Sequence, residues 1–131
     1  MAHLIIVRGL PGSGKSTYAS DLAERNEFNH YEADMFFEDE NGNYNFQANK
    51  IRFAHQWCQG KVFSSLSSGK DTVVSNTFCQ MWEMKPYMDF CKINGHTFSF
   101  VTCESEYGSI HDVPEETYEK MKQRWQDVTV A

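Results

Sequence analysis

Apolar and polar positions along the first third of the chain change their period twice. The run His3–Val7 is short, almost wholly apolar and rich in β-branched residues, which predicts a strand buried on both faces of a parallel sheet. A glycine-rich stretch, Gly9–Gly14, comes next, and the pattern after it predicts a helix over 15–25. Asn29–Ala33 is typical of a second strand, which would carry Asp34 at its carboxyl end.

The middle of the chain repeats this order. Apolar residues recur at helical spacing over 47–68, and Gly69 predicts the end of that helix. The apolar positions are Ile51, Ala54, Cys58, Val62 and Leu66. Thr72–Ser75 is another short β-branched run, so a third strand is expected that ends in Asn76.

The last third predicts a helix, a strand and a final helix. Pro86 suits the first turn of a helix that Gly95 would end, and Thr97–Cys103 predicts a strand. The final helix is expected to start at Asp112 or Val113, because a proline follows. The residues that this helix aligns on one face are Tyr118, Met121 and Trp125.

Strands that alternate with helices predict the α/β class. We expect three layers, a parallel sheet of about four to five strands with helices on both faces. The spacing does not determine the strand order. At 131 residues the chain is expected to form a single domain over 1–131, since domains run to roughly 100–200 residues.

Composition narrows the class of protein. A net charge of −6 argues against a protein that coats nucleic acid by bulk charge. The longest apolar run, Leu4–Val7, is far too short to span a bilayer, so no membrane partner is expected. The four cysteines form no C-x-x-C pair, and no secretory leader is visible. These features predict reduced, mostly buried thiols in a cytoplasmic protein.

The segment Gly9–Ser16 matches G-x-x-x-x-G-K-[ST] between a predicted strand and a predicted helix, which is the setting of a phosphate-binding P-loop. Glycines let backbone N–H groups converge on phosphate oxygens. Lys15 would place its charge near the β- and γ-phosphates, and Ser16 would offer its hydroxyl to Mg²⁺. ATP and Mg²⁺ are therefore the expected cofactors, and the preference between ATP and GTP stays open. The predicted cofactor-binding residues are Gly9, Pro11, Gly12, Ser13, Gly14, Lys15, Ser16 and Thr17.

Six segments together resemble the polynucleotide-kinase-like family of P-loop proteins. They are Gly9–Thr17, Asp34–Phe37, Ala54–Cys58, Ser75–Thr77, Trp82–Tyr87 and Ile110–Pro114. The chain is similar to the kinase domain of the bacteriophage polynucleotide 5′-hydroxyl kinase. It is more similar to short phage and bacterial P-loop proteins described as AAA-type ATPases, and the similarity extends to a domain of a eukaryotic ubiquitin-ligase-binding protein. The resemblance implies a nucleotide-kinase-like P-loop NTPase fold rather than a ring-forming motor. It also implies a phage or bacterial source, and thus host cytoplasm for a virus-encoded chain.

The resemblance also implies a reaction, transfer of the ATP γ-phosphoryl group to a hydroxyl acceptor, accompanied by ATPase activity. In the kinase, the Asp that matches Asp34 receives the proton of the attacking 5′-hydroxyl. Lys15 and Asp34 are thus the implied catalytic residues, and Ser16 is the implied Mg²⁺ ligand. Two other roles for Asp34 stay open: to cap a helix that starts at Met35, or to help hold Mg²⁺.

The chain departs from this family at three places. Phe37 stands where the kinase has an arginine that grips a substrate phosphate. Ser75–Thr77 lacks the Asp that relatives usually carry at one of its first two positions, and Glu104–Val113, which matches the kinase lid, contains no Lys or Arg. Arginine fingers are worth about 10³–10⁵ in rate. The alternative is therefore a catalytically degenerate module whose nucleotide controls protein interaction, unless the cations of the last helix replace the fingers. These cations are Lys120, Lys122 and Arg124.

Several other residues have a functional and a structural interpretation. His55 and Cys58 have half of a metal-ligand spacing, but no second pair exists, so core packing is favoured. Glu38–Glu40 is expected to be a solvated loop, and nothing in the sequence decides the role of His111. The aromatics that could stack on a base, or pack in the core, are Phe36, Phe37, Tyr44, Phe46 and Trp57. A monomer is the default expectation, and the acceptor, a nucleic-acid 5′-hydroxyl or a small molecule, is not identified.

Overall fold

Four parallel strands form one sheet in the computed structural model, which describes residues 1–104 and 115–127. The strands are β1 (His3–Gly9), β2 (Asn29–Tyr31), β3 (Thr72–Asn76) and β4 (Thr97–Cys103), and their spatial order is β2-β3-β1-β4. The α-helices of the described residues are α1 (Lys15–Asn26), α2 (Ile51–Ser67), α3 (Met81–Asn94) and α4 (Glu115–Arg124).

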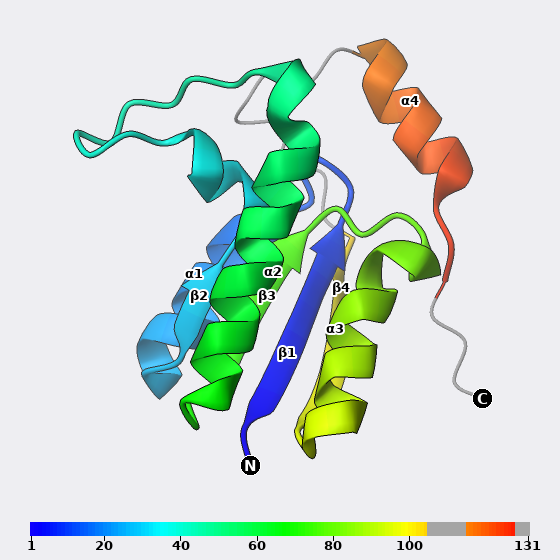
Figure 1. Ribbon diagram of the computed structural model, residues 1–131. Coiled ribbons are helices and arrows are strands. Elements are labelled where there is room, and N and C mark those ends of the chain that lie inside the picture. Colours follow the sequence, from blue (N-terminus) through cyan, green and yellow to red (C-terminus); the bar gives the residue numbers. More distant parts are fainter. Residues whose placement is uncertain (105–114, 128–131) are drawn as a thin grey trace.

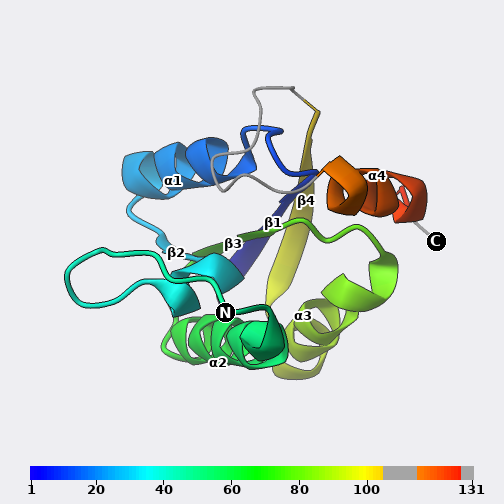
Figure 2. The same cartoon turned by 90° about the horizontal axis from the view of Figure 1, so that it is seen from above.

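Helices cover both faces of the sheet, with α1 on one side and α2 and α3 on the other (Figure 2). Alternate residues of β1 divide between the two layers. Leu4 and Ile6 join the core built with α2 and α3, while Val7 packs with Ala19 and Ala23 of α1. Because both faces of β1 are buried, the strand is apolar from Leu4 to Val7, as the sequence predicts.

The strand order creates a switch point between β1 and β3. The chain leaves β1 through α1 toward β2, and it leaves β3 through α3 toward β4, on the opposite face of the sheet. Loops that leave neighbouring strands in opposite directions open a crevice at the carboxyl ends of those strands. The P-loop follows β1 at this crevice, and Gly9 N donates a hydrogen bond to the carbonyl of Thr77, beyond β3, at 3.3 Å.

The predicted three-layer α/β class and the four predicted strands are confirmed, and the predicted helix ends at Gly69 and Gly95 agree with the structure. One prediction was wrong: Pro86 does not lie in the first turn of its helix. Helix α3 begins five residues earlier, at Met81, because Gln80 and Glu83 form a capping box, with Glu83 Oε2 accepting from Gln80 N at 2.9 Å. Pro86 therefore lies inside the helix, where its ring removes one backbone donor.

One further boundary differs from the predicted helices, and one stays untested. A short 3₁₀ helix, Ala48–Lys50, occupies the start of the segment expected to be one helix over 47–68, and α2 proper starts at Ile51. The predicted start of the last helix at Asp112 or Val113 lies outside the described residues. Within those residues, no helix is both long and apolar enough to cross a membrane.

Arg8 joins the carboxyl-terminal segment to the centre of the sheet. Its side chain is 1% exposed, and its guanidinium donates to the carbonyls of Phe78, at 2.7 and 3.1 Å, and Gln126, at 2.5 Å. The same group lies 4.0 Å from the ring centre of Trp125, a cation–π contact. Helix α4 consequently stands at the end of the molecule toward which the strands point (Figure 1).

Candidate active site at the carboxyl edge of the sheet

The loop after β1 has the backbone shape that a phosphate cradle requires. Gly12 and Gly14 have φ angles of 81° and 83°, in the left-handed region that glycine adopts without strain. Gly14 directly precedes α1, and among the described residues no side chain caps that helix and no acidic residue lies in its first turn. The first N–H groups of α1 are thus left for an anion, which the positive end of the helix dipole favours.

Gly9 admits no larger residue in this conformation. A Cβ atom there would lie 2.2 Å from Ser13 Oγ and 2.9 Å from the carbonyl oxygen of Cys103, so the loop and the end of β4 close around it. Ser13 Oγ is itself buried and finds no hydrogen-bond partner among the described residues. An unpaired hydroxyl within the loop is what a cradle built for a polar ligand leaves when the ligand is absent.

Lys15 is half-buried at the start of α1, and within the described residues it forms no ion pair. Burial lowers the pKa of its ammonium group, although Glu32 and Asp34 lie near enough to oppose the shift. A desolvated cation of this kind is stabilised when an anion binds beside it. The placement of Lys15 therefore suits a polyphosphate at the P-loop.

Glu32, a residue that the sequence analysis did not single out, lies at the centre of the site. Ser75 Oγ donates to Glu32 Oε1 at 2.5 Å, and His30 Nε2 lies 3.4 Å from the same oxygen. Burial opposes ionisation of this carboxyl, but hydrogen bonds from His30, Ser75 and the P-loop residue Ser16 outweigh it and hold its pKa below the usual value. Glu32 is therefore an ionised carboxylate bonded to the P-loop and to β3.

The sequence contains a weak signal for Glu32 that the predicted strand Asn29–Ala33 concealed. Strand β2 ends at Tyr31, so Glu32 is the first residue beyond it rather than part of its interior. Correct placement of the strand end would have put Glu32 at the carboxyl edge of the sheet, where ligands bind in open α/β sheets.

Asp34 lies at the carboxyl edge of the sheet, as predicted, in a 3₁₀ helix that spans Ala33–Phe37. Its side chain is exposed, and the hydroxyl of Tyr44 donates to Asp34 Oδ1 at 3.2 Å. Burial, followed by the charge of Asp34, raises the pKa of Tyr44 to about 12, so the phenol stays a donor at neutral pH. The helix-cap role is not observed, because Glu32 occupies the cap position.

The aromatic residues beside Asp34 pack mostly against one another. Phe37 is buried, with its ring 5.4 Å from that of Phe36 and 5.1 Å from that of Phe46, while Trp57 lies 6.3 Å from Phe36. Phe37 thus contributes to the core in place of the phosphate-gripping arginine. The half-exposed ring of Phe46 is the member of this group that a ligand could reach most easily.

Of the half-site at His55 and Cys58, the cysteine is a core residue and His55 is half-buried, which agrees with the core packing favoured by the lack of a second ligand pair. Cys58 is fully buried on α2, and the Asn76 side-chain amide donates to its sulfur at 3.8 Å. Among residues 1–104 and 115–127, no group of three or more His, Cys, Asp or Glu side chains could hold a metal ion. Any metal here would have to be bound by few protein ligands.

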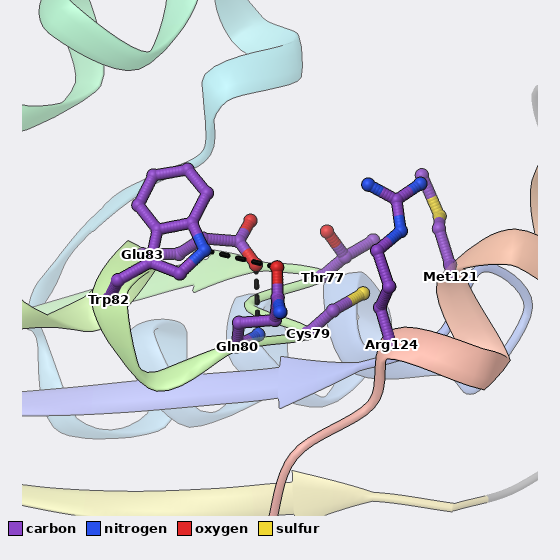
Figure 3. A pocket seen from close by; sticks show the side chains of 7 residues that line it. All are labelled: Thr77, Cys79, Gln80, Trp82, Glu83, Met121 and Arg124. Atoms are coloured by element: carbon purple, nitrogen blue, oxygen red, sulfur yellow. Dashed lines mark hydrogen bonds between the residues drawn. The ribbon is translucent and has the colours of Figure 1, made fainter.

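A small pocket opens between the loop after β3 and helix α4 (Figure 3). Its volume is about 100 Å³. The lining residues are Thr77, Cys79, Gln80, Trp82, Glu83, Met121 and Arg124. Trp82 is 68% exposed, and Arg124 brings a cation to the pocket, whereas Lys120 pairs with Glu116 at 3.5 Å. The predicted lid after Glu104, with His111, lies outside the described residues.

Comparisons with known proteins agree with this geometry. The family model of the AAA domain matches residues 4–108. Human NEDD4-binding protein 2 is 30% identical over 135 residues, which cover 94% of this chain but 8% of that protein, so the chain spans a small part of its curated relative.

Two kinase structures share the fold. The Pnkp1/Rnl/Hen1 complex has a TM-score of 0.62 at 21% identity, over 91% of this chain and 38% of that one. The APS kinase CysC of Mycobacterium tuberculosis has a TM-score of 0.60 at 14% identity, over 94% and 96% of the two chains.

Proposed function

The chain belongs to the AAA domain family and has the fold of P-loop kinases, and from this premise we propose that it transfers the γ-phosphoryl group of ATP to a hydroxyl acceptor. The observation that supports transfer, rather than nucleotide binding alone, is an exposed carboxylate beside the P-loop. Asp34 lies close enough to Lys15 to influence its pKa, while its own side chain faces solvent. An acceptor arriving from solvent would thus meet a proton acceptor next to the bound phosphates.

The P-loop would bind the nucleotide. Backbone N–H groups of Gly12–Gly14 and of the first turn of α1 would donate to phosphate oxygens, and Lys15 would contact the β- and γ-phosphates. The unpaired Ser13 hydroxyl and the Ser16 hydroxyl, with carboxylates nearby, form a donor set that fits a nucleotide and its Mg²⁺. Bound Mg²⁺ supplies positive charge that offsets the charge of the phosphates.

Asp34 would orient and deprotonate the acceptor. The acceptor oxygen forms a bond to the γ-phosphorus, its proton passes to a carboxylate oxygen of Asp34, and the bond from the γ-phosphorus to the β–γ bridging oxygen breaks to release ADP. Tyr44 holds Asp34 Oδ1 by its hydrogen bond, which leaves the second oxygen to receive the proton. Without an acceptor, water would take its place and produce slow hydrolysis.

Arg124, one of the cations of the last helix, could partly replace the lid arginines. It lines the pocket next to Thr77, whose carbonyl bonds to the first P-loop residue, Gly9. Trp82 offers an exposed ring at the same pocket, where a nucleobase could stack. The acceptor class that we propose is therefore a nucleic-acid 5′-hydroxyl or a nucleotide, with other small hydroxyl compounds as further candidates.

The alternative is a nucleotide-dependent interaction module without catalysis. Two observations support it. The buried ring of Phe37 stands where the kinase has its phosphate-gripping arginine, and residues 104–113 contain no Lys or Arg. In that case ATP would act by stabilising one conformation for a protein partner. Tight ATP binding without turnover, together with nucleotide-dependent capture of a partner, would favour it.

Transfer of labelled γ-phosphate from ATP-Mg²⁺ over a panel of acceptors tests the proposal. The panel holds 5′-hydroxyl DNA, 5′-hydroxyl RNA, nucleosides, nucleotides and water alone, each with the Lys15→Ala and Asp34→Asn variants. Glu38→Gln, an exposed carboxylate in the same loop, is the matched control. We expect label on one acceptor class, lost in both site variants and kept in the control. A protein that binds ATP but labels no acceptor and releases no phosphate would contradict the proposal.

A further inference from the structure

The end of β3 lacks the acidic residue that the family resemblance predicts there as a Mg²⁺ ligand. Strand β3 ends in Ser75 and Asn76, neither of which carries a charge. Mg²⁺ is usually held by one or two carboxylates together with phosphates and water. Ser16 alone, a neutral hydroxyl, would not supply that charge.

Asn76 has a different structural task and is not available to bind a cation. Its Oδ1 accepts a hydrogen bond from the backbone N–H of Ala33 at 2.9 Å, and its amide nitrogen donates to the sulfur of Cys58. The side chain is 8% exposed. Asn76 therefore fastens the segment that carries Asp34 to the end of β3.

Glu32 occupies the gap between the P-loop and β3. Ser75 Oγ, at the end of β3, and the side chain of Ser16, at the P-loop, both bond to the Glu32 carboxylate. His30 Nε2 lies 2.8 Å from Ser75 Oγ, which fixes the hydroxyl that holds the carboxylate. The side chain of Glu32 is 14% exposed, so few alternative orientations are open to it.

From this arrangement we propose that Glu32 is the carboxylate of the Mg²⁺ site, supplied by the end of β2 in place of an acidic residue on β3. The inference rests on the proposed function, since it assumes that the P-loop binds a nucleotide with its metal. Ser16 and Glu32 then hold the cation, directly or through a water molecule, and phosphates and water complete its shell. In the described part of the chain no group of three or more His, Cys, Asp or Glu side chains could hold a metal ion, so Glu32 would be one of few protein ligands.

This assignment leaves Asp34 free for the acceptor. Asp34 is exposed and bonds to Tyr44, whereas both hydroxyls that flank the metal position point to Glu32. The two carboxylates of the segment Glu32–Asp34 thus divide two tasks. One is buried and bound to the phosphate cradle, and the other is presented to solvent.

Binding of Mn²⁺ to the complex of the protein with ADP, measured from the electron paramagnetic resonance signal of free Mn²⁺, tests the proposal. In Glu32→Gln we expect the Kd for Mn²⁺ to rise about 10- to 100-fold. Affinity for ADP in EDTA should stay within about twofold, because the loop amides and Lys15 are unchanged. Asp34→Asn and the exposed control Glu38→Gln should keep the Mn²⁺ affinity of the wild type.

A swap variant keeps the test decisive if Glu32→Gln does not fold. In Glu32→Ser/Ser75→Asp, the carboxylate and one hydroxyl exchange places across the same hydrogen bond. A folded swap variant should bind Mn²⁺ within about tenfold of the wild type, since the charge stays between the P-loop and β3. A swap variant that binds ADP in EDTA but has lost Mn²⁺ affinity would overturn the assignment.

Two other outcomes also overturn the assignment of Glu32 to the Mg²⁺ site. One is unchanged Mn²⁺ affinity in Glu32→Gln. The other is a loss of Mn²⁺ affinity in Asp34→Asn that equals or exceeds the loss in Glu32→Gln. Failure of the proposed function has a different signature. A wild-type protein that binds ADP and Mn²⁺, loses the metal in Glu32→Gln and labels no acceptor would retain the metal site and exclude the phosphotransferase. A wild-type protein that does not bind ADP would overturn both.

Discussion

Two residues of the P-loop are placed to bind a ligand, and their placement destabilises the ligand-free protein. Lys15 is desolvated, and its pKa is lowered by burial, while Ser13 Oγ is buried without a partner. Both groups would be better solvated in an unfolded chain. Stability and ligand binding therefore oppose each other at these two positions.

Replacement of Lys15 by methionine should separate these two effects. Lys15→Met keeps the apolar stem and removes the desolvated charge, so the ligand-free protein should be as stable as the wild type or more stable. The stabilisation by ATP-Mg²⁺, about 2.7 kcal/mol at 100 times the Kd, should disappear. Thermal unfolding with and without nucleotide measures both quantities. Lys61→Met, at an exposed position of α2, should leave the nucleotide effect intact; its loss there would argue against a specific role for Lys15.

Glu32 should make the stability of the protein sensitive to acid. Burial opposes its ionisation, but three hydrogen bonds hold its pKa below the usual 4.5, so the folded state favours the carboxylate. The resulting stability is fully present above pH 4.5 and is lost as the pH falls through the lower folded pKa. The difference in unfolding free energy between wild type and Glu32→Gln should therefore be largest near pH 7 and shrink below about pH 4.5. Urea unfolding at a series of pH values checks this, and a difference that does not change with pH would contradict it.

At the scale of elements, two glycines differ in the space that they leave for a side chain. Gly9→Ala should destabilise the protein by about 1–3 kcal/mol, since its Cβ would collide with the Cys103 backbone as well as with Ser13. Gly60, in the middle of α2, is exposed and meets nothing within 4 Å. Gly60→Ala should therefore stabilise by about 0.5–1 kcal/mol through helix propensity. Denaturant unfolding of the two variants measures both signs, and equal effects would show that the loop can relax around a side chain.

Some elements of the fold could be predicted from the sequence and others could not. β1, the P-loop and α1 could be predicted because an apolar run, glycines and a helical period are local signals, and each agrees with the structure. The start of α3 could not, because a capping box between Gln80 and Glu83 overrides the usual position of Pro86. The role of Glu32 was missed for a further reason. It depends on contacts with Ser16 and Ser75, which the fold brings together from distant parts of the chain.

At the scale of the whole molecule, the side chain of Arg8 connects three distant segments. Arg8 is buried in β1, yet it bonds to carbonyls beyond β3 and to the residues that follow α4, where Gln126 N also donates to Cys79 O at 2.7 Å. The local sequence does not predict this role, since charged side chains are rarely buried within an apolar strand. Arg8 holds α4, and with it Arg124, beside the loop after β3.

Substitution of Arg8 by lysine should loosen this connection. Lysine keeps the charge but cannot reproduce the planar fork that reaches several carbonyls, so Arg8→Lys should cost about 2–3 kcal/mol of stability. Hydrogen exchange over 115–127 should accelerate more than exchange in α1, and Arg25→Lys, at an exposed position, serves as the control. An unchanged exchange rate over 115–127 would show that α4 is held by other contacts.

The free thiols can report, through their rates of alkylation, on the opening of the layers and on ligand binding. Cys58 and Cys91 are fully buried between the sheet and its helices, and burial raises the pKa of both thiols, that of Cys91 to about 11. An alkylating reagent reacts with the thiolate, so at neutral pH it should modify these two cysteines when their layer opens. Cys103, half-buried, has its backbone against Gly9, and a nucleotide in the loop should shield it from the same reagent. The labelling rates of Cys58 and Cys91 would thus follow core breathing, and that of Cys103 would follow ligand occupancy, with no probe added to the chain.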